Sequence, residues 1–277
     1  MTAPDFASGK GHRDENFPVA SKLVAPAYRA PIMAFYRFAR AADDIADHTG
    51  ATAEKKLAGL AAMRAGLTGS GAPEAVALAE VMDARGLDPR HANDLLDAFE
   101  QDVRVNRYAS WEALIDYCRL SAMPVGRFVL DVHGEDRATW PASDALCAAL
   151  QVINHLQDCG KDYRAIDRVY LPADMLAATG ARIEDLAAPA ASPALHATIT
   201  LMARRTQDLL AESAPFASMI RNRRLASEVA VIQRLAESLT CRLIAHDPLS
   251  ERVHHGKAEA ALIAVWAAAR YWTGRRA

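Results

Sequence analysis

Asp43 and Asp47 lie at the end of an apolar stripe that has the spacing of an α-helix. The stripe is made of residues at intervals of three and four, namely Ile32, Phe35, Tyr36 and Ala39. Because residues i and i+4 share one face of a helix, about 6 Å apart along its axis, the two carboxylates extend the face that the helix buries. Two carboxylates at this spacing repel each other unless a cation lies between them. The pattern predicts a helix with a cation site, and its alternative is a solvated acidic face.

A second aspartate pair has the same spacing in the middle of the chain. Gln151, Asn154, Asp158 and Asp162 form one polar column at intervals of three, four and four. The rest of this helix is mostly apolar, with Leu146, Ala149, Leu150, Val152, Ile153 and Leu156. A narrow polar column on a mostly apolar helix indicates that the column lines a cavity. Two such helices facing each other would form an acidic mouth for a diphosphate with bound Mg²⁺, since Mg²⁺ prefers carboxylate oxygens and keeps positions for substrate phosphates.

The predicted fold is all-α, in one domain that spans residues 1–277. Alternation of Val, Ile and Thr is almost absent, so strands are not expected. The 277 residues, 51% of them hydrophobic, suffice for one large domain with a deep core. Helical patterns cover residues 19–28, 31–47, 53–67, 73–85, 90–105, 110–134, 141–164, 193–214, 217–242 and 256–272. A break is predicted at Pro31, and residues 173–192 are predicted to form a loop.

Charge, cysteines and hydropathy limit the partners and the compartment. The formal net charge of -2 gives no electrostatic reason to expect a nucleic acid. The four cysteines show no CxxC spacing and are expected to be free thiols in a reducing compartment. The chain has no N-terminal segment of the signal-peptide type, and its longest apolar run, residues 260–269, is well short of the about 20 residues that span a bilayer. The expected location is cytoplasmic, with peripheral contact to a membrane surface left open.

Taken in order, the helical motifs resemble those of the squalene/phytoene synthase family of head-to-head isoprenoid synthases. The similar segments are residues 35–47, 101–108, 117–122, 151–162 and 168–172. The first and fourth of these look like the two aspartate-rich motifs of the family. The resemblance implies a class I isoprenoid synthase fold, a helical bundle around a central cavity.

Three features look like the branch of this family that belongs to the hopanoid pathway and makes hydroxysqualene. They are residues 14–21, residues 120–127 and Gln157 directly before Asp158. His155 departs from the apolar residue expected at its position. Members of this branch are similar in converting presqualene diphosphate to hydroxysqualene and diphosphate without NADPH. The chain has no GxGxxG turn, which agrees with a reaction that needs no reductant.

The resemblance also implies Mg²⁺, as more than one ion, bound by the carboxylates of both pairs. The metal-ligating candidates are Asp43, Asp44, Asp47, Asn154, Asp158 and Asp162. Bound Mg²⁺ would make the diphosphate a better leaving group. Gln151 and Asn154 would hold metal-bound water or phosphate oxygens, or alternatively form a buried amide network.

Basic residues near the aspartate pairs are candidates for contacts with the diphosphate. Arg40 lies one turn before Asp43 and can reach a diphosphate through two parallel hydrogen bonds, or it forms a salt bridge to Asp44. Lys161 and Arg168 are weaker candidates for the same contact.

Ionisation of the substrate would leave a carbocation, which needs a water-poor cavity with aromatic faces and no strong nucleophile nearby. Aromatic candidates for the walls are Phe17, Phe35, Tyr36, Tyr117, Phe128 and Tyr170, although most aromatic residues at helical spacing simply form the core. Tyr117 is favoured as a catalytic residue through its motif. Contacts with the substrate are expected from Phe17, Ser21, Ala122 and Tyr170. The sequence does not identify the group that positions the water for hydroxysqualene formation.

The leading hypothesis is a Mg²⁺-dependent enzyme that makes hydroxysqualene, with its substrate handed over by the enzyme that makes presqualene diphosphate. The first alternative is a synthase of presqualene diphosphate or phytoene that condenses two prenyl diphosphates. The second alternative is a non-catalytic helical assembly factor of the same fold. Such factors tend to lose the metal-binding carboxylates, whereas all four are present here.

Overall fold

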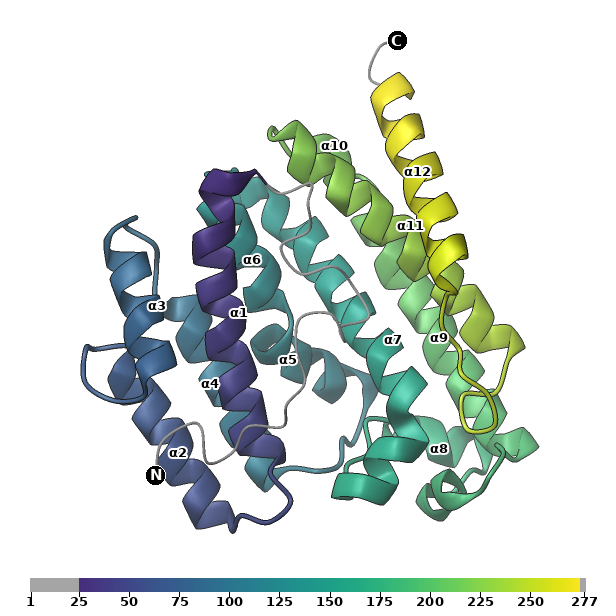
Figure 1. Cartoon of the computed structure of the whole chain (residues 1–277). Helices are drawn as coiled ribbons and strands as arrows, with labels where there is room; N and C mark the ends of the chain where they lie inside the picture. Colours follow the sequence, from purple (N-terminus) through teal and green to yellow (C-terminus); the bar gives the residue numbers. More distant parts are fainter. Residues whose placement is uncertain (1–24, 275–277) are drawn as a thin grey trace. The chain divides into compact units, whose positions relative to one another are not determined.

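The computed structural model describes residues 25–274, which form two compact helical units (Figure 1). Unit 1 contains residues 25–105 and 120–136, and unit 2 contains residues 106–119 and 137–274. Within these ranges the chain forms helices and no strand, and Arg107 makes an isolated parallel bridge with Val169 in unit 2. The predicted all-α fold is confirmed, while the extent of one domain over residues 1–277 stays a prediction.

Unit 1 is organised around its first helix. The helices are α1 (Pro26–Asp47), α2 (Ala53–Gly66), α3 (Pro73–Asp83), α4 (Arg90–Arg104) and α6 (Met123–Val132). α1 packs against the other four and supplies Phe35, Phe38 and Ile45 to the core. The rings of Phe35 and Phe128 stack with their centroids 4.0 Å apart. This buried apolar contact fixes the helix that carries the first aspartate pair.

Pro31 lies inside α1, so the helix boundary predicted at this residue is wrong. A proline removes the hydrogen bond to the carbonyl four residues earlier, which here is the Ala27 carbonyl. Arg85 donates from Nη2 to that carbonyl at 2.9 Å and so compensates for the missing bond. The helix therefore continues through Pro31 and carries its apolar face from Ile32 to Ile45 without a break.

The helix predicted over residues 110–134 is divided at Ala122. α5 (Trp111–Ser121) ends before this residue, and α6 follows it with Pro124 in its first turn. The backbone of Ala122 has φ −124° and ψ −47°, which is not helical. Proline suits the first turn of a helix because it has no N–H group, and the same property interrupts a continuous helix.

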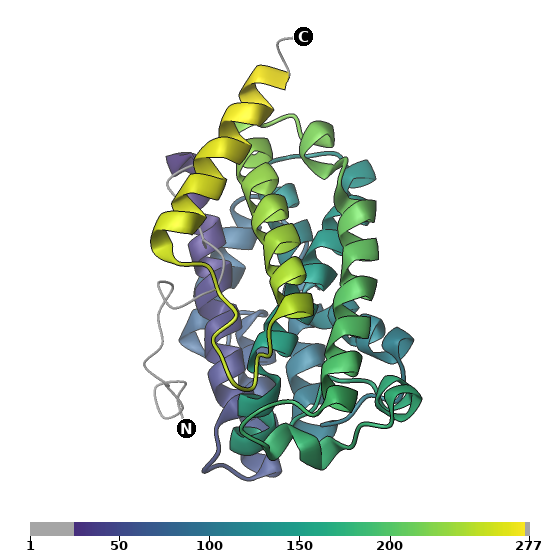
Figure 2. The same cartoon turned by 90° about the vertical axis from the view of Figure 1, so that its right-hand side faces the viewer.

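Unit 2 is centred on α7, which has 27 residues and packs against α9 and α11. Unit 2 includes α5 as far as Arg119. Its other elements are the short 3₁₀ helix η2 (Arg137–Thr139), α7 (Trp140–Ile166), α8 (Ala173–Thr179), the short 3₁₀ helix η3 (Ile183–Ala187), α9 (Pro193–Ser213), α10 (Phe216–Met219), α11 (Arg223–Ala245) and α12 (Lys257–Gly274). α12 lies along α11, as Figures 1 and 2 show from two directions.

Two further boundaries in unit 2 differ from the prediction. Residues 173–192 are not a simple loop, because they contain α8 and η3, and α8 is ended by Gly180 with φ 75°. The helix predicted over residues 217–242 is divided between α10 and α11, and Asn222 caps α11 by accepting hydrogen bonds from two backbone N–H groups at 3.1 and 3.2 Å. The helix predicted over residues 19–28 lies mostly outside the described residues.

Candidate active site

The first aspartate pair lies in the last turns of α1. Asp43, Asp44 and Asp47 are partly exposed, and the neighbouring Ala42 and Ile45 are buried. The carboxylates therefore emerge at the edge of the buried face, as the apolar stripe predicts. The last carbonyl groups of a helix have no intrahelical partner, so they add negative potential beside these carboxylates.

Arg40 forms ion pairs with two of these carboxylates. Its Nη1 lies 2.8 Å from Asp43 Oδ2, and its Nη2 lies 2.6 Å from Asp44 Oδ1. The salt bridge to Asp44 that sequence reasoning offered as the alternative is thus present. Contact between Arg40 and a diphosphate stays a prediction.

Asp43 is held in an environment that disfavours its charge. Burial, followed by the charge of Asp47, raises the pKa of Asp43 from 3.8 to about 7, while Arg40 opposes the rise. Asp44 and Asp102 add smaller contributions in the same direction as Asp47. Asp102 lies on α4, which packs on α1, and sequence reasoning did not assign it to the site. The sequence feature that could have pointed to Asp102 was its place in the segment 101–108, which resembles the family.

The α1 carboxylates fit a divalent cation by their chemistry. A carboxyl group that keeps its proton to about pH 7 because of burial and the charge of Asp47 would release it to a cation, whose charge favours the carboxylate. Among residues 25–274, no three His, Cys, Asp or Glu side chains are grouped closely enough to hold a metal ion by themselves. Mg²⁺ is usually bound by one or two carboxylates together with water and substrate phosphates, so this donor set suffices. Metal binding stays a prediction.

The second aspartate pair lies on α7 in unit 2. Gln151, Asn154, Asp158 and Asp162 are all partly exposed, whereas the residues on the other faces of this helix segment are largely buried. The Asp158 side chain is 41% exposed, and Lys161 Nζ lies 3.6 Å from its Oδ2. Lys161 is therefore close enough to approach an anion bound near Asp158.

Gln157 anchors α7 to the segment that precedes α12. This buried side chain donates from Nε2 to the Val253 carbonyl at 2.6 Å. Leu186 and Leu249 lie close to the α7 backbone at Gly160, on the same side of the helix. A Cβ at this position would lie 3.3 Å from both the Leu186 carbonyl oxygen and Leu249 Cγ. Gln157 thus has a structural contact within unit 2, in addition to the branch resemblance that it carries.

Four aromatic side chains gather in unit 2. The Tyr117 ring centroid lies 5.3 Å from that of Tyr108, 5.8 Å from Tyr170 and 6.2 Å from His155. The imidazole of His155 stacks on Tyr170 with the centroids 3.4 Å apart and the planes 14° from parallel. All four are buried. Sequence reasoning named Tyr117 and Tyr170 for this environment and noted His155 as unusual, but it missed Tyr108.

His155 is buried as a neutral ring. Burial, and next the charge of Arg168, lowers the pKa of His155 to about 3. Its Nε2 is buried and has no hydrogen-bond partner within residues 25–274. A buried polar atom without a partner costs about 1–3 kcal/mol unless water supplies the bond. A water molecule at this nitrogen would supply the missing hydrogen bond.

The remaining predicted residues have various surroundings. Arg168 is buried and donates from Nη1 to the Tyr170 hydroxyl at 3.3 Å, so its contact with phosphate stays a prediction. Ala122 is buried at the start of α6. Phe35 and Phe128, two of the candidate walls, belong to the stacked core of unit 1. Phe17 and Ser21 lie outside the described residues.

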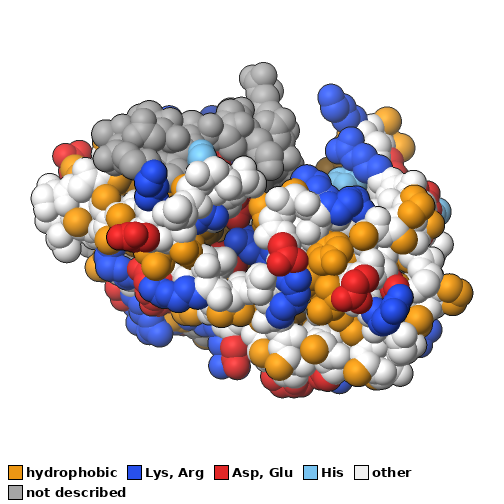
Figure 3. All heavy atoms as spheres, turned by 90° about the horizontal axis from the view of Figure 1, so that it is seen from below, with side chains coloured by type: hydrophobic (Ala, Val, Ile, Leu, Met, Phe, Trp, Pro, Cys, Tyr) orange, Lys and Arg blue, Asp and Glu red, His pale blue; other side chains and the backbone are white. Residues whose placement is uncertain are grey.

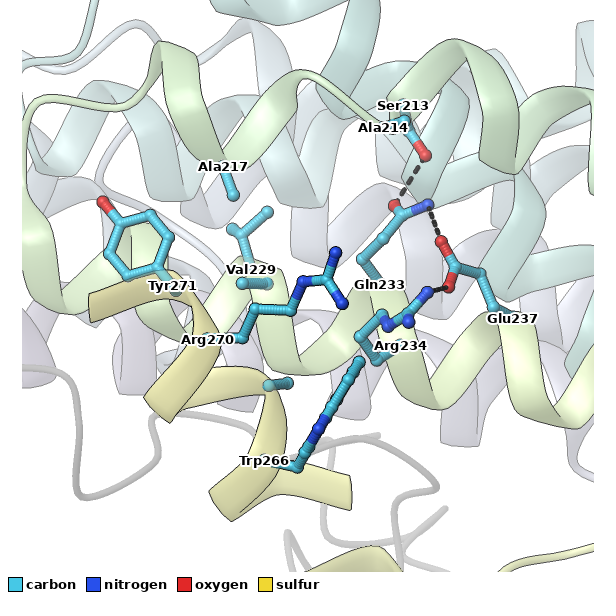
Figure 4. Close-up of a pocket in the computed structure, with 12 residues that line it drawn as sticks. Ser213, Ala214, Ala217, Val229, Gln233, Arg234, Glu237, Trp266, Arg270 and Tyr271 are labelled. Atoms are coloured by element: carbon cyan, nitrogen blue, oxygen red, sulfur yellow. Dashed lines mark hydrogen bonds and ion pairs between the residues drawn. The ribbon is translucent and has the colours of Figure 1, made fainter. Parts of the chain in front are cut away.

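A separate pocket of about 290 Å³ is formed by α9, α10, α11 and α12, and none of the predicted site residues line it. Figure 4 shows its polar network. Ser213 Oγ donates to Gln233 Oε1 at 2.7 Å, and Gln233 Nε2 donates to Glu237 Oε1 at 3.1 Å. Glu237 also forms an ion pair with Arg234. Ser213, Gln233, Glu237 and Arg234 thus bond one another within this pocket.

Acidic and basic side chains are interspersed on the face drawn in Figure 3, so this face has no large patch of one charge. The absence of a nucleic-acid partner stays a prediction. No helix of the described part of the chain combines the length and the apolar character that a membrane span requires.

Residues 11–259 match the squalene/phytoene synthase family, and the chain belongs to this family, whose members typically use Mg²⁺. It is 57% identical to the hydroxysqualene synthase of Zymomonas mobilis, over 97% of this chain and 92% of the relative. It is 54% identical to the hydroxysqualene synthase of Rhodopseudomonas palustris, over 91% of this chain and 87% of the relative. The crystal structure of squalene synthase HpnC from Alicyclobacillus acidocaldarius is similar with a TM-score of 0.71 at 32% identity, covering 80% of this chain and 85% of that one. The family resemblance and the isoprenoid synthase fold are confirmed.

Proposed function

We propose that this chain is a Mg²⁺-dependent enzyme that converts presqualene diphosphate to hydroxysqualene and diphosphate. The observation that carries the proposal is 57% identity to a hydroxysqualene synthase over 97% of this chain. The residues add support, because both aspartate pairs of the family motifs are present on α1 and α7. A prenyl diphosphate is the substrate class that these relatives imply.

Release of diphosphate requires negative charge to be neutralised as the carbon–oxygen bond breaks. Mg²⁺, when bound, acts as a Lewis acid on the diphosphate. Asp43, Asp47, Asp158 and Asp162 would hold it, with Asp44 and Asn154 in support. Arg40 and Lys161 carry the positive charge that contacts the remaining phosphate oxygens. Where the Asp43 carboxyl group carries a proton, it must give that proton up on cation binding, because its pKa is raised to about 7.

The cation left after ionisation is quenched by water in this proposal. The water oxygen forms the new bond to carbon, and its proton leaves with the released diphosphate, so no oxidant or reductant is needed. Tyr117 and Tyr170 offer π faces to a carbocation, and the neutral ring of His155 adds no positive charge to that of Arg168, which donates to the Tyr170 hydroxyl. His155 Nε2 is our candidate for the group that holds the water, because it is a buried ring nitrogen without a hydrogen-bond partner within the described range.

The two competing functions have less support from the residues. A synthase of presqualene diphosphate or phytoene would share the fold and the carboxylates, but Gln157 and the 120–127 segment resemble the hydroxysqualene branch. A non-catalytic assembly factor would have no need of four carboxylates in two motifs. The substrate would be handed over by the enzyme that makes presqualene diphosphate, in the cytoplasm or at a membrane surface.

Incubation of the purified protein with presqualene diphosphate and Mg²⁺ in ¹⁸O-labelled water tests the proposal directly. The expected product is an alcohol that carries the label, formed equally with and without NADPH. Squalene without label that appears only with NADPH would assign a reducing squalene synthase instead. Condensation of farnesyl diphosphate without reaction of presqualene diphosphate would favour the synthase alternative. A folded protein that is inactive on both substrates would favour the non-catalytic alternative.

The water-holding group has its own test. His155→Leu restores an apolar residue at this position and removes the acceptor, whereas His155→Gln keeps a polar side chain. With His155→Leu the labelled alcohol should fall relative to hydrocarbons formed by proton loss, while total diphosphate release is maintained. His155→Gln should retain more of the alcohol. An unchanged product ratio in both variants would remove His155 from this step.

A further inference from the structure

One side of α12 exposes a row of apolar side chains, which we call the α12 outer face. Its members are Leu262, Val265, Trp266 and Trp272, with exposed fractions of 72%, 69%, 48% and 43%. At about 100° per residue they lie within about 120° of the helix circumference. The opposite side is buried at Ala267, where α12 lies on α11. A contiguous apolar face that remains exposed in the folded chain marks an interaction surface.

Arginines border this face at its two tryptophans. Cζ of Arg234 and Cζ of Arg270 lie 4.9 and 5.3 Å from the Trp266 ring centroid, and Figure 4 shows both guanidinium groups beside the indole. Cζ of Arg223 lies 5.9 Å from the Trp272 ring centroid. Arg234 is neutralised by Glu237, whereas no carboxylate of residues 25–274 is within ion-pair distance of Arg223 or Arg270. Two positive charges at the edge of the face are therefore available to an anionic partner.

We propose that the α12 outer face docks on the surface of an anionic lipid bilayer. Its apolar side chains would enter the interfacial region, and Arg223 and Arg270 would contact lipid phosphates. Tryptophan favours the boundary between acyl chains and headgroups, and arginine beside it is attracted by anionic headgroups. The helix would lie on the membrane, since no described helix is suited to span one. The proposal rests on the surface formed by α12 and Arg223 of α11, and it is independent of the reaction.

Sedimentation of the full chain with vesicles tests this docking. One set of vesicles contains equal parts of phosphatidylglycerol and phosphatidylcholine, and the other contains phosphatidylcholine alone. We expect binding to the anionic set, weakened by added salt because screening reduces the attraction. Tryptophan emission should shift to shorter wavelength on binding. Replacement of Trp266 and Trp272 by phenylalanine should remove most of that shift, because the other two tryptophans, Trp111 and Trp140, do not belong to the outer face.

Matched variants separate the apolar and the charged contributions. Leu262→Gln with Val265→Gln should weaken binding about tenfold or more. Val105→Gln, at an apolar residue that is 37% exposed in unit 1, is the control and should leave binding unchanged. Arg270→Gln should weaken binding about fivefold, whereas Arg204→Gln, at an exposed arginine of α9, should have no effect.

Clear outcomes overturn the proposal. Circular dichroism identical to wild type shows that the variants fold, as expected for exposed positions. No binding to anionic vesicles, or equal binding by the Leu262→Gln/Val265→Gln variant, would refute docking through this face. Self-association that the same double variant abolishes, without any vesicle binding, would instead assign the face to a second copy of this chain.

Discussion

Replacement of Asp43 by asparagine tests whether the α1 carboxylates are held together against their repulsion. In the folded chain burial and the neighbouring Asp47 raise the pKa of Asp43 from 3.8 to about 7. A carboxyl group with a raised pKa costs the fold nothing below its unfolded pKa and destabilises it as the pH rises towards its folded pKa. Asparagine keeps the shape and carries no charge. Asp43→Asn should therefore raise the free energy of unfolding above about pH 7 and change it little at about pH 4.

The size of the effect follows from the shift and the exposure. For a fully buried group, a rise from 3.8 to about 7 corresponds to about 4 kcal/mol. The Asp43 side chain is 36% exposed, so solvent screens part of the repulsion and we expect about 1–2 kcal/mol. Arg40 retains its ion pair with Asp44 at 2.6 Å in the variant, so its charge is not left alone.

Urea unfolding followed by circular dichroism at about pH 4 and about pH 8, without divalent cations, measures this difference. The matched control is Asp83→Asn, the same substitution at an exposed position of unit 1, which should change stability by no more than about 0.5 kcal/mol at either pH. Added Mg²⁺ should stabilise the wild type at the higher pH, because a ligand that binds the folded state alone shifts unfolding. It should stabilise Asp43→Asn less.

The opposite result would refute the reasoning. If Asp43→Asn were no more stable than wild type at about pH 8, burial and the charge of Asp47 would not disfavour the Asp43 carboxylate in the folded chain. If Mg²⁺ stabilised the variant and the wild type equally, Asp43 would not be a ligand.

Four other substitutions or titrations probe the rest of the chain. Asp158→Asn should reduce diphosphate release roughly 10²-fold or more with the helical signal intact, and a wild-type rate at low Mg²⁺ would exclude Asp158 as a ligand. Gln157→Leu should leave the Val253 carbonyl without its donor, cost about 1–3 kcal/mol in urea unfolding, and speed hydrogen exchange in the segment before α12. Burial lowers the pKa of His155 to about 3, so its imidazole NMR signals should remain those of the neutral ring from about pH 8 to about pH 5, and titration in that window would contradict its burial. Ala122→Phe should block turnover of the long substrate by bulk while Mg²⁺ binding persists, and unchanged turnover would place this residue away from the substrate.

Helical periodicity made the two aspartate pairs and their setting predictable from the sequence. Ile32 and Phe35 of the apolar stripe are buried in α1, whereas its members Tyr36 and Ala39 are partly buried. The polar column of α7 is the partly exposed side of a mostly buried helix. Both results depend on the turn of a single helix, which relates residues three and four apart. The sequence contains that information locally, so no knowledge of distant contacts was needed.

The tertiary structure decided the features that depend on partners far along the chain. Pro31 stays within α1 because Arg85 donates to the carbonyl that the proline leaves without a bond. Asp102 joins the α1 carboxylates because α4 packs on α1, and its charge then contributes to the raised pKa of Asp43. No local pattern specifies either neighbour.

The aromatic cluster shows the same division. Tyr108 and Tyr117 come from residues 106–119, His155 from α7 and Tyr170 from the segment before α8. Packing of these parts of unit 2 brings neighbouring rings to centroid distances of 3.4 to 6.2 Å. From the sequence His155 was merely an unusual residue on an apolar helix. The fold buries it, keeps it neutral and leaves its Nε2 without a partner inside the described range, because burial and neighbours are set by tertiary packing while helical periodicity is set by the sequence alone.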